Sequence, residues 1–155
     1  MIIEVNLPSF LQPYKNKNLI RLGNDYDGGY LVDKNIVRES DALISFGISY
    51  DWSFEKDFFK LNRCDIFTFD GSVGVNFFYA KVKNRIKNTF KNINLSYLSK
   101  TIWWLIIPLR FFTFFNNINF GSRRKHHEMF VYENTKNIDI EYFFKKNGYK
   151  PKFIK

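Results

Sequence analysis

Two short hydrophobic runs lie near the middle of the chain, and a small or acidic residue closes each of them. Residues 42–47 read Ala-Leu-Ile-Ser-Phe-Gly, and residues 65–70 read Asp-Ile-Phe-Thr-Phe-Asp. Their length and apolar character predict two buried strands. Between them, Phe54, Phe58 and Leu61 recur at helical spacing. A strand, helix and strand joined by short connections predict a parallel pair with a right-handed crossover.

Four further segments have readable patterns. The turn-forming residues near 24–30 predict a small hairpin over residues 19–33. Residues 76–100 predict a basic amphipathic helix with a break near residues 92–94, and its aromatic residues fall on the apolar stripe, as core residues do. Residues 138–147 predict another helix, and residues 151–155 predict the beginning of a strand.

The most apolar segment runs from Ile102 to Phe115 and contains Pro108 and Arg110. A membrane-spanning helix needs about 20 predominantly apolar residues, and this segment has 14. The pattern favours a buried core segment. The alternatives are an interfacial segment or an exposed interaction surface.

The charge is unevenly distributed along the chain. Residues 1–70 hold 8 Lys and Arg against 11 Asp and Glu, whereas residues 71–155 hold 16 against 4. Such asymmetry suggests a surface that meets nucleic acid, phosphate-bearing sugar or acidic lipid. The alternative is a lysine-rich composition that leaves solvated faces.

The number of cysteines and the first ten residues bear on the cellular compartment. Cys64 is the one cysteine, so the chain forms no internal disulfide and no cysteine-based metal cluster. The first ten residues have neither a basic region nor a long apolar run, so we expect no signal peptide. We therefore expect a reduced, cytoplasmic environment.

The most informative unit for function is residues 42–71. Ligands of doubly wound sheets bind at the carboxyl ends of the strands, and Gly47 lets a ligand approach the backbone closely. Asp51 is placed to cap the following helix, and Asp70 stands 19 positions further on at the tip of the second strand. A carboxylate there can accept hydrogen bonds from a ribose diol. The alternative is that Asp51 only caps a helix and Asp70 only ends a strand.

The same unit argues against a dinucleotide. Ser49 and Asp51 stand where a G-x-G-x-x-G pattern would have glycines, and an acid at the helix start would repel a pyrophosphate. S-adenosylmethionine carries a cationic sulfonium and no phosphate, so it tolerates acidic groups at this position.

Three segments resemble the N-terminal half of the FkbM-type (methyltransferase-21) S-adenosylmethionine-dependent methyltransferases. They are Arg-Leu-Gly-Asn-Asp-Tyr-Asp-Gly-Gly-Tyr at 21–30, Ser-Phe-Gly-Ile-Ser-Tyr-Asp-Trp-Ser-Phe-Glu at 45–55, and Phe-Thr-Phe-Asp at 67–70. The resemblance covers about residues 19–72, with a weaker echo at 117–155. It implies an α/β class I methyltransferase fold, Rossmann-like with a mostly parallel sheet, that methylates a hydroxyl of a sugar or glycan acceptor.

The resemblance also assigns residues to the cofactor site. Gly47, Ser49 and Asp51 match the family's glycine loop, and Glu55 matches the acidic end of that loop. Asp70 matches the acid that binds the ribose. Asp27, Gly28 and Gly29 match the family's upstream block. No residue is assigned as catalytic and no metal is expected. His126 and His127 fall in the charged stretch 123–127, which predicts a solvated loop.

The family pattern continues past a fourth strand, of which residues 152–155 are the start. The expectation is therefore a single incomplete methyltransferase domain over 1–155, truncated there, with a cofactor-binding core at 19–72 and a basic, aromatic-rich insertion at 76–127. A protein partner could complete the fold. The competing hypotheses are a non-catalytic fragment and a basic binding module. For such a module, peripheral membrane contact fits better than nucleic acid, because the aromatics do not interleave with the basic face.

Overall fold

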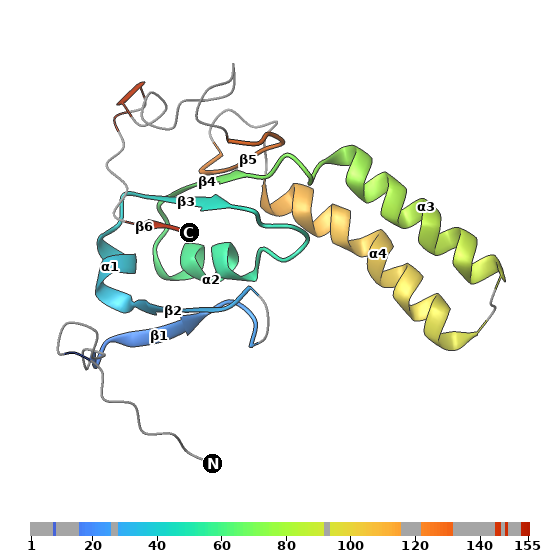
Figure 1. Ribbon diagram of the computed structural model, residues 1–155, viewed down its shortest axis with the longest axis horizontal. Coiled ribbons are helices and arrows are strands. Elements are labelled where there is room, and N and C mark those ends of the chain that lie inside the picture. The colour runs from blue at the N-terminus through green and yellow to red at the C-terminus, as the bar shows by residue number, and fades with distance from the viewer. Residues whose placement is uncertain are drawn as a thin grey trace, which may run out of the picture.

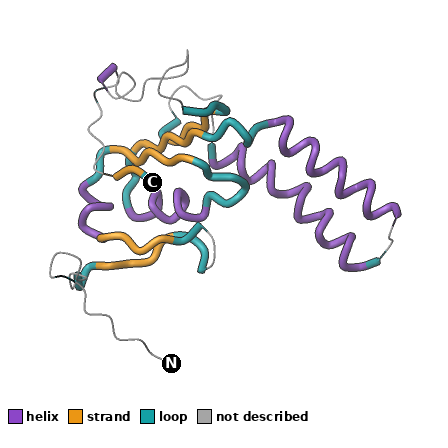
Figure 2. The backbone as a smooth tube through the Cα atoms, viewed as in Figure 1, coloured by secondary structure: helices purple, strands orange, loops and turns teal. Residues whose placement is uncertain are grey.

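The fold is a mixed α/β arrangement in which a parallel sheet carries a projecting helical hairpin (Figures 1 and 2). The computed structural model describes residues 8, 16–25, 28–91, 94–115, 122–131, 145–146, 148 and 153–155. The elements in chain order are β1 (Leu19–Leu22), β2 (Tyr30–Asp33), α1 (Lys34–Glu39), β3 (Ala42–Phe46), α2 (Ser53–Leu61), β4 (Asp65–Phe69), α3 (Val75–Lys91), α4 (Leu95–Phe114), β5 (Arg124–His127) and β6 (Phe153–Ile154).

The sheet has the order β5-β4-β3-β6, and every pairing in it is parallel. β3 and β4 pair from Ala42 opposite Asp65 to Phe46 opposite Phe69, which confirms the predicted parallel pair. β6 pairs with β3 through Ile44 and Ile154, which confirms the strand expected near residues 151–155. Gly47 and Asp70 follow directly after β3 and β4, so both lie at the carboxyl rim.

The two faces of the sheet differ in their cover. One face packs against α2 and the adjoining part of the helical hairpin, and its buried residues include Leu43, Phe54, Phe58, Ile66, Phe78 and Phe111. The other face has a smaller cluster made of Ala42, Ile44, Phe67 and Phe69. The apolar spacing that predicted α2 is therefore confirmed at Phe54 and Phe58, whereas Leu61 at the end of the helix remains 37% exposed.

The predicted hairpin at 19–33 is confirmed as the antiparallel pair β1 and β2, which join from Leu19 opposite Asp33 to Leu22 opposite Tyr30. It lies beside α2 (Figure 1). Asp33 then caps α1, because its carboxylate accepts the amides of Asn35 and Ile36.

The predicted helix at 76–100 is two helices, α3 and α4, that pack antiparallel and extend away from the sheet (Figure 1). Asn94 begins α4, because its side chain accepts the amide of Tyr97, so the predicted break is confirmed. The expected core stripe is confirmed only in part: Phe78 is buried and Val82 and Tyr97 are half-buried, whereas Ile86 is 38% and Phe90 is 78% exposed. The hairpin extends beyond the sheet, so nothing in the described chain covers these positions.

The apolar segment 102–115 forms the second half of α4, and the prediction of a buried core segment holds for only one of its faces. Trp104, Ile107 and Phe111 are buried. Ile102 and Leu109 on other sides of the helix are 48% and 67% exposed. Among the described helices, none is both long enough and apolar enough to cross a bilayer.

Two further expectations concern the C-terminal third. The solvated loop predicted at 123–127 is wrong, because residues 124–127 form β5 at the edge of the sheet and His126 is buried. The charged residues of this stretch suggested solvent exposure, and the pairing of β5 with β4 is a long-range contact that the local sequence does not indicate. The helix predicted at 138–147 lies outside the described residues, apart from residues 145–146.

Candidate functional site

The turn after β3 has an unusual backbone. Gly47 has φ of +63° and Ser49 has φ of +50°, a region that residues other than glycine enter rarely. A Cβ placed on Gly47 would meet no atom within 4 Å, so the space above this glycine is open. Positive φ in a non-glycine residue is a strained conformation that clusters at functional sites.

Asp70 reaches this turn from the neighbouring strand. Its Oδ2 accepts the amide of Ser49 at 2.9 Å, and its Oδ1 accepts both the amide and the hydroxyl of Ser72 at 2.9 and 2.6 Å. Burial by itself would raise the pKa of Asp70, but the hydrogen bonds from Ser72 and Ser49 and the nearby His126 hold that pKa below its ordinary value. Asp70 is therefore an anion fixed at the rim.

Two cavities open at this rim, and Gly47 lies on the wall of both. One has a volume of about 410 Å³ and is lined by Phe46, Gly47, Phe69, Asp70, Met129, Phe130 and Val131. The other, of about 150 Å³, is lined by Gly28, Tyr30, Gly47, Ile48, Ser49, Tyr50, Asp51 and Lys155. Between them, the walls carry five of the predicted site residues: Gly28, Gly47, Ser49, Asp51 and Asp70.

Asp51 ties the upstream glycine block to the start of α2. Its Oδ2 accepts the side-chain amide of Asn24 at 2.7 Å, and its Oδ1 accepts the amide of Ser53 at 2.9 Å. The N-cap of α2 is Trp52 rather than the predicted Asp51, yet the Asp51 carboxylate still holds a first-turn amide. A Cβ on Gly28, whose φ is +87°, would approach Asp51 Oδ2 to 2.8 Å, so this position needs glycine. Asp27 lies outside the described residues, and Gly29 does not line either cavity.

Glu55 lies behind the wall rather than on it. Its side chain is fully buried, and Oε1 accepts the Ser45 hydroxyl at 2.5 Å and the Lys155 ammonium at 2.8 Å. Oε2 has no hydrogen-bond partner among the described residues. Glu55 therefore holds α2, β3 and the residue after β6 together. Its partner Lys155 does line the smaller cavity.

Of the two histidines of β5, His126 is buried and His127 is half-buried. His126 Nε2 lies 2.7 Å from the carbonyl oxygen of Val73, and Nδ1 lies 2.9 Å from the hydroxyl of Thr68. The His127 ring stacks on Phe69 at 4.9 Å between ring centres. Burial lowers the pKa of both histidines, so both are neutral at pH 7. His126 contacts Thr68 and His127 contacts Phe69, so both pack against the end of β4 and do not form a solvated anion-binding loop.

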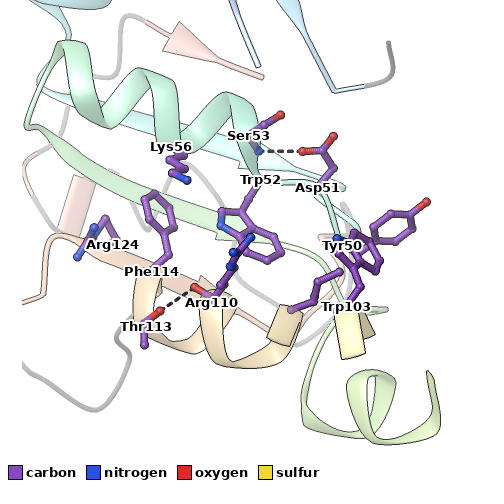
Figure 3. A pocket seen from close by; sticks show the side chains of 11 residues that line it. Tyr50, Asp51, Trp52, Ser53, Lys56, Trp103, Arg110, Thr113, Phe114 and Arg124 are labelled. Atoms are coloured by element: carbon purple, nitrogen blue, oxygen red, sulfur yellow. Dashed lines mark hydrogen bonds between the residues drawn. The ribbon is translucent and has the colours of Figure 1, made fainter. Parts of the chain in front are cut away.

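A larger groove lies on the far side of Tyr50 and Asp51. It has a volume of about 650 Å³ and runs between the start of α2 and the side of α4 (Figure 3). Three cations, Lys56, Arg110 and Arg124, line it together with the aromatic residues Tyr50, Trp52, Trp103 and Phe114. The Arg124 guanidinium lies over the Phe114 ring at 4.8 Å.

Sequence reasoning missed most of the apolar wall, because Met129, Phe130 and Val131 lie about 60 residues beyond Asp70 in the chain. The general rule that ligands bind at the carboxyl ends of strands would have pointed to the residues after β5. The described part of the chain contains no group of three metal-ligating side chains. No protein-family model, curated protein or solved structure matches this chain.

Proposed function

We propose that the chain binds S-adenosylmethionine at the carboxyl rim of β3 and β4 and is an FkbM-type methyltransferase that acts on a hydroxyl of a sugar or glycan. One observation carries the proposal: the turn after Gly47 and the carboxylate of Asp70 meet at one rim, joined by the 2.9 Å bond from the Ser49 amide to Asp70. The 410 Å³ cavity beside them combines aromatic and apolar walls with a single carboxylate. An adenosyl group needs both features, because its base is flat and its ribose carries a diol.

The start of α2 favours this cofactor over a dinucleotide. A pyrophosphate binds at a helix N-terminus through free amides and the positive end of the helix dipole. Here the Asp51 carboxylate already occupies the amide of Ser53, and its charge would repel a phosphate. A sulfonium cation meets no such repulsion.

The smaller cavity suits the methionine end of the cofactor. Asp51 and Lys155 line it with opposite charges, and the backbone of Gly47 and Ser49 lies between them in the wall. A zwitterion presents one ammonium and one carboxylate, so the charges of the wall and of the ligand are complementary. In this arrangement Asp51 would hold the ammonium, and Lys155 would hold the carboxylate.

The groove in Figure 3 is our candidate for the acceptor site, because it shares Tyr50 and Asp51 with the smaller cavity. Methyl transfer is an in-line displacement in which the protein chiefly positions the acceptor oxygen near the methyl group. The aromatic walls suit the apolar faces of a sugar ring. Lys56, Arg110 and Arg124 suit an acceptor that also carries phosphate or carboxylate.

Isothermal calorimetry with S-adenosylmethionine, and separately with S-adenosylhomocysteine, tests cofactor binding. Asp70→Asn is expected to weaken binding at least tenfold, because a charged acceptor of ribose hydrogen bonds is lost. Asp65→Asn, at the opposite end of β4, is the matched control and should leave affinity unchanged. Gly47→Asn places a side chain in the open space with little backbone strain, and it should abolish binding while the chain stays folded.

The outcomes separate the parts of the proposal. Absence of binding by a folded chain would refute the cofactor assignment. Binding without turnover on hydroxyl acceptors would favour the non-catalytic alternative. Loss of turnover in Arg110→Gln, with cofactor affinity retained, would support the acceptor groove, and unchanged turnover would refute it.

A further inference from the structure

The hairpin of α3 and α4 leaves a long apolar surface uncovered. We call this surface the hairpin face. On α3 it consists of Val75, Tyr79, Ile86 and Phe90, and on α4 of Leu95, Leu98, Ile102, Leu105, Leu109 and Phe112. These side chains are between 38% and 82% exposed. The α4 members recur every three and four residues, which places them on one stripe of the helix.

The two stripes lie on the same side of the hairpin. The helices meet at Thr89 and Thr101, whose hydroxyl groups hydrogen-bond at 2.6 Å. Successive residues of a helix are rotated by about 100° around its axis. Measured from the threonine at which the helices meet, each stripe is rotated in the same sense around its own helix. Ile86 precedes Thr89 by three residues, just as Leu98 precedes Thr101, so each is rotated by about 60°. Because the helices are antiparallel, equal rotations bring both stripes to one face.

The hairpin that carries this face has basic residues and no acidic residue. From Val75 to Phe115 the chain has seven basic residues and no acidic one: Lys81, Lys83, Arg85, Lys87, Lys91, Lys100 and Arg110. The helical rotation places Lys83 and Lys87 along the α3 border of the face, and Arg110 lies beyond its α4 border. Long basic side chains at such borders can lay their stems along an apolar surface and extend their charges outward.

We propose that the hairpin face docks on an anionic lipid surface. The apolar side chains would enter the boundary between headgroups and acyl chains, and the bordering cations would meet the lipid phosphates. Charge decides between this partner and a second copy of the chain. Two hairpin faces in contact would bring the Lys83 and Lys87 borders of both copies together, and neither hairpin has an acidic residue to set against its seven basic ones. An anionic lipid surface supplies the opposite charge.

The proposal agrees with where the hairpin leaves the sheet. α3 begins shortly after the carboxyl end of β4, at the rim that carries Gly47 and Asp70 (Figure 1). Docking of the hairpin would therefore hold this rim close to the lipid surface. Lipid binding itself needs no cofactor, so the inference stands or falls independently of the proposed function.

The test is co-sedimentation of the whole chain with vesicles of phosphatidylcholine, with and without 30% phosphatidylglycerol, a composition we choose as roughly that of an anionic membrane. We expect binding to the mixed vesicles that weakens as salt is raised, and much weaker binding to phosphatidylcholine alone. Lys83→Gln with Lys87→Gln should lower the partition coefficient roughly 10- to 30-fold. Phe90→Gln with Leu95→Gln should lower it at least as much, and because both residues are exposed, the fold should be unaffected.

Matched controls lie outside the hairpin. Lys17→Gln with Arg38→Gln removes two exposed cations, and Leu31→Gln removes an apolar side chain that is 65% exposed; none should change vesicle binding. Failure to bind mixed vesicles would overturn the proposal. The proposal would also be overturned if the control variants lost as much vesicle binding as the hairpin variants, or if Phe90→Gln with Leu95→Gln left vesicle binding unchanged. Sedimentation velocity tests the other occupant. If the chain does not bind vesicles but forms a dimer, and Phe90→Gln with Leu95→Gln converts that dimer to monomers, the hairpin face contacts a second copy instead.

Discussion

The buried pair of Glu55 and Lys155 gives the sharpest stability prediction. The Glu55 side chain is fully buried, that of Lys155 is 11% exposed, and their charged atoms lie 2.8 Å apart. Glu55 also accepts the Ser45 hydroxyl at 2.5 Å. The change Lys155→Met keeps an unbranched side chain of similar length but leaves the Glu55 charge without its cation.

The magnitude follows from the geometry. At 2.8 Å and an effective dielectric constant of about 20, the attraction is about 6 kcal/mol. Burial of both charges offsets a large part of this attraction. Removing one partner nevertheless costs about 3 to 5 kcal/mol, because an uncompensated charge stays buried. We expect Lys155→Met to lower the free energy of unfolding by that amount.

Urea unfolding followed by circular dichroism measures the loss. The double variant Glu55→Gln with Lys155→Met removes both charges and keeps an acceptor for Ser45, so it should recover most of the stability. A loss below about 1 kcal/mol in Lys155→Met would show that the pair is solvated in solution, contrary to the burial on which the estimate depends. A double variant no more stable than the single one would show that the harm comes from packing, not from the unpaired charge.

Three further predictions concern the rim and the core beneath it. Gly47→Ala should lower the free energy of unfolding, measured with urea, by about 1 to 2 kcal/mol, because φ is +63° at this position. Gly47→Asn should lower it by less, because asparagine tolerates the left-handed region better than alanine does. Equal losses in the two variants would argue against the left-handed turn. Burial lowers the pKa of His126 and His127 below the ordinary 6.5, so near and below that pH the unfolded chain binds more protons than the folded chain. The free energy of unfolding should therefore fall as the pH drops below about 6.5 and stay level above it. His126→Gln should make this slope shallower, and an unchanged slope would contradict the assignment. Burial, the largest cause, raises the pKa of Cys64 to about 11, so iodoacetamide at pH 8 should alkylate the native chain far more slowly than the urea-unfolded chain; equal rates would refute the burial.

The part of the fold that the sequence predicts best is the part that local periodicity determines. β3, α2 and β4 carry their own patterns, and the parallel pairing follows from the short connections between them. The convergence of Gly47 and Asp70 is a consequence of that topology, since the carboxyl ends of parallel neighbours share one rim. The sequence therefore anticipates the rim, although the identity of its ligand stays a proposal.

The parts that sequence reasoning misjudged depend on distant contacts. The apolar residues Phe78, Ile86 and Phe90 recur at multiples of four positions, so Ile86 and Phe90 are rotated by about 80° and 120° from Phe78 around α3, and the pattern does not show which of them another element covers. Phe78 packs at 5.0 Å against the ring of Phe111, whereas the other two extend past the core. His126 follows three consecutive basic residues and so suggests a solvated loop, yet its pairing with Thr68 across 58 positions buries it.

The hydrogen bonds that Asp70 already makes within the protein limit how the proposed ribose could bind. An ionised carboxylate offers about four acceptor positions, and Asp70 already uses three of them, for Ser49 and twice for Ser72. The bonds to the amides of Ser49 and Ser72 hold the turn after β3 and the loop after β4, so we expect the proposed ligand to leave them in place. The Ser72 hydroxyl can rotate away without moving the backbone. Under the proposed function, a ribose diol would take one free position directly and a second only by replacing the Ser72 hydroxyl, so Ser72 would be the residue that adjusts to the nucleoside.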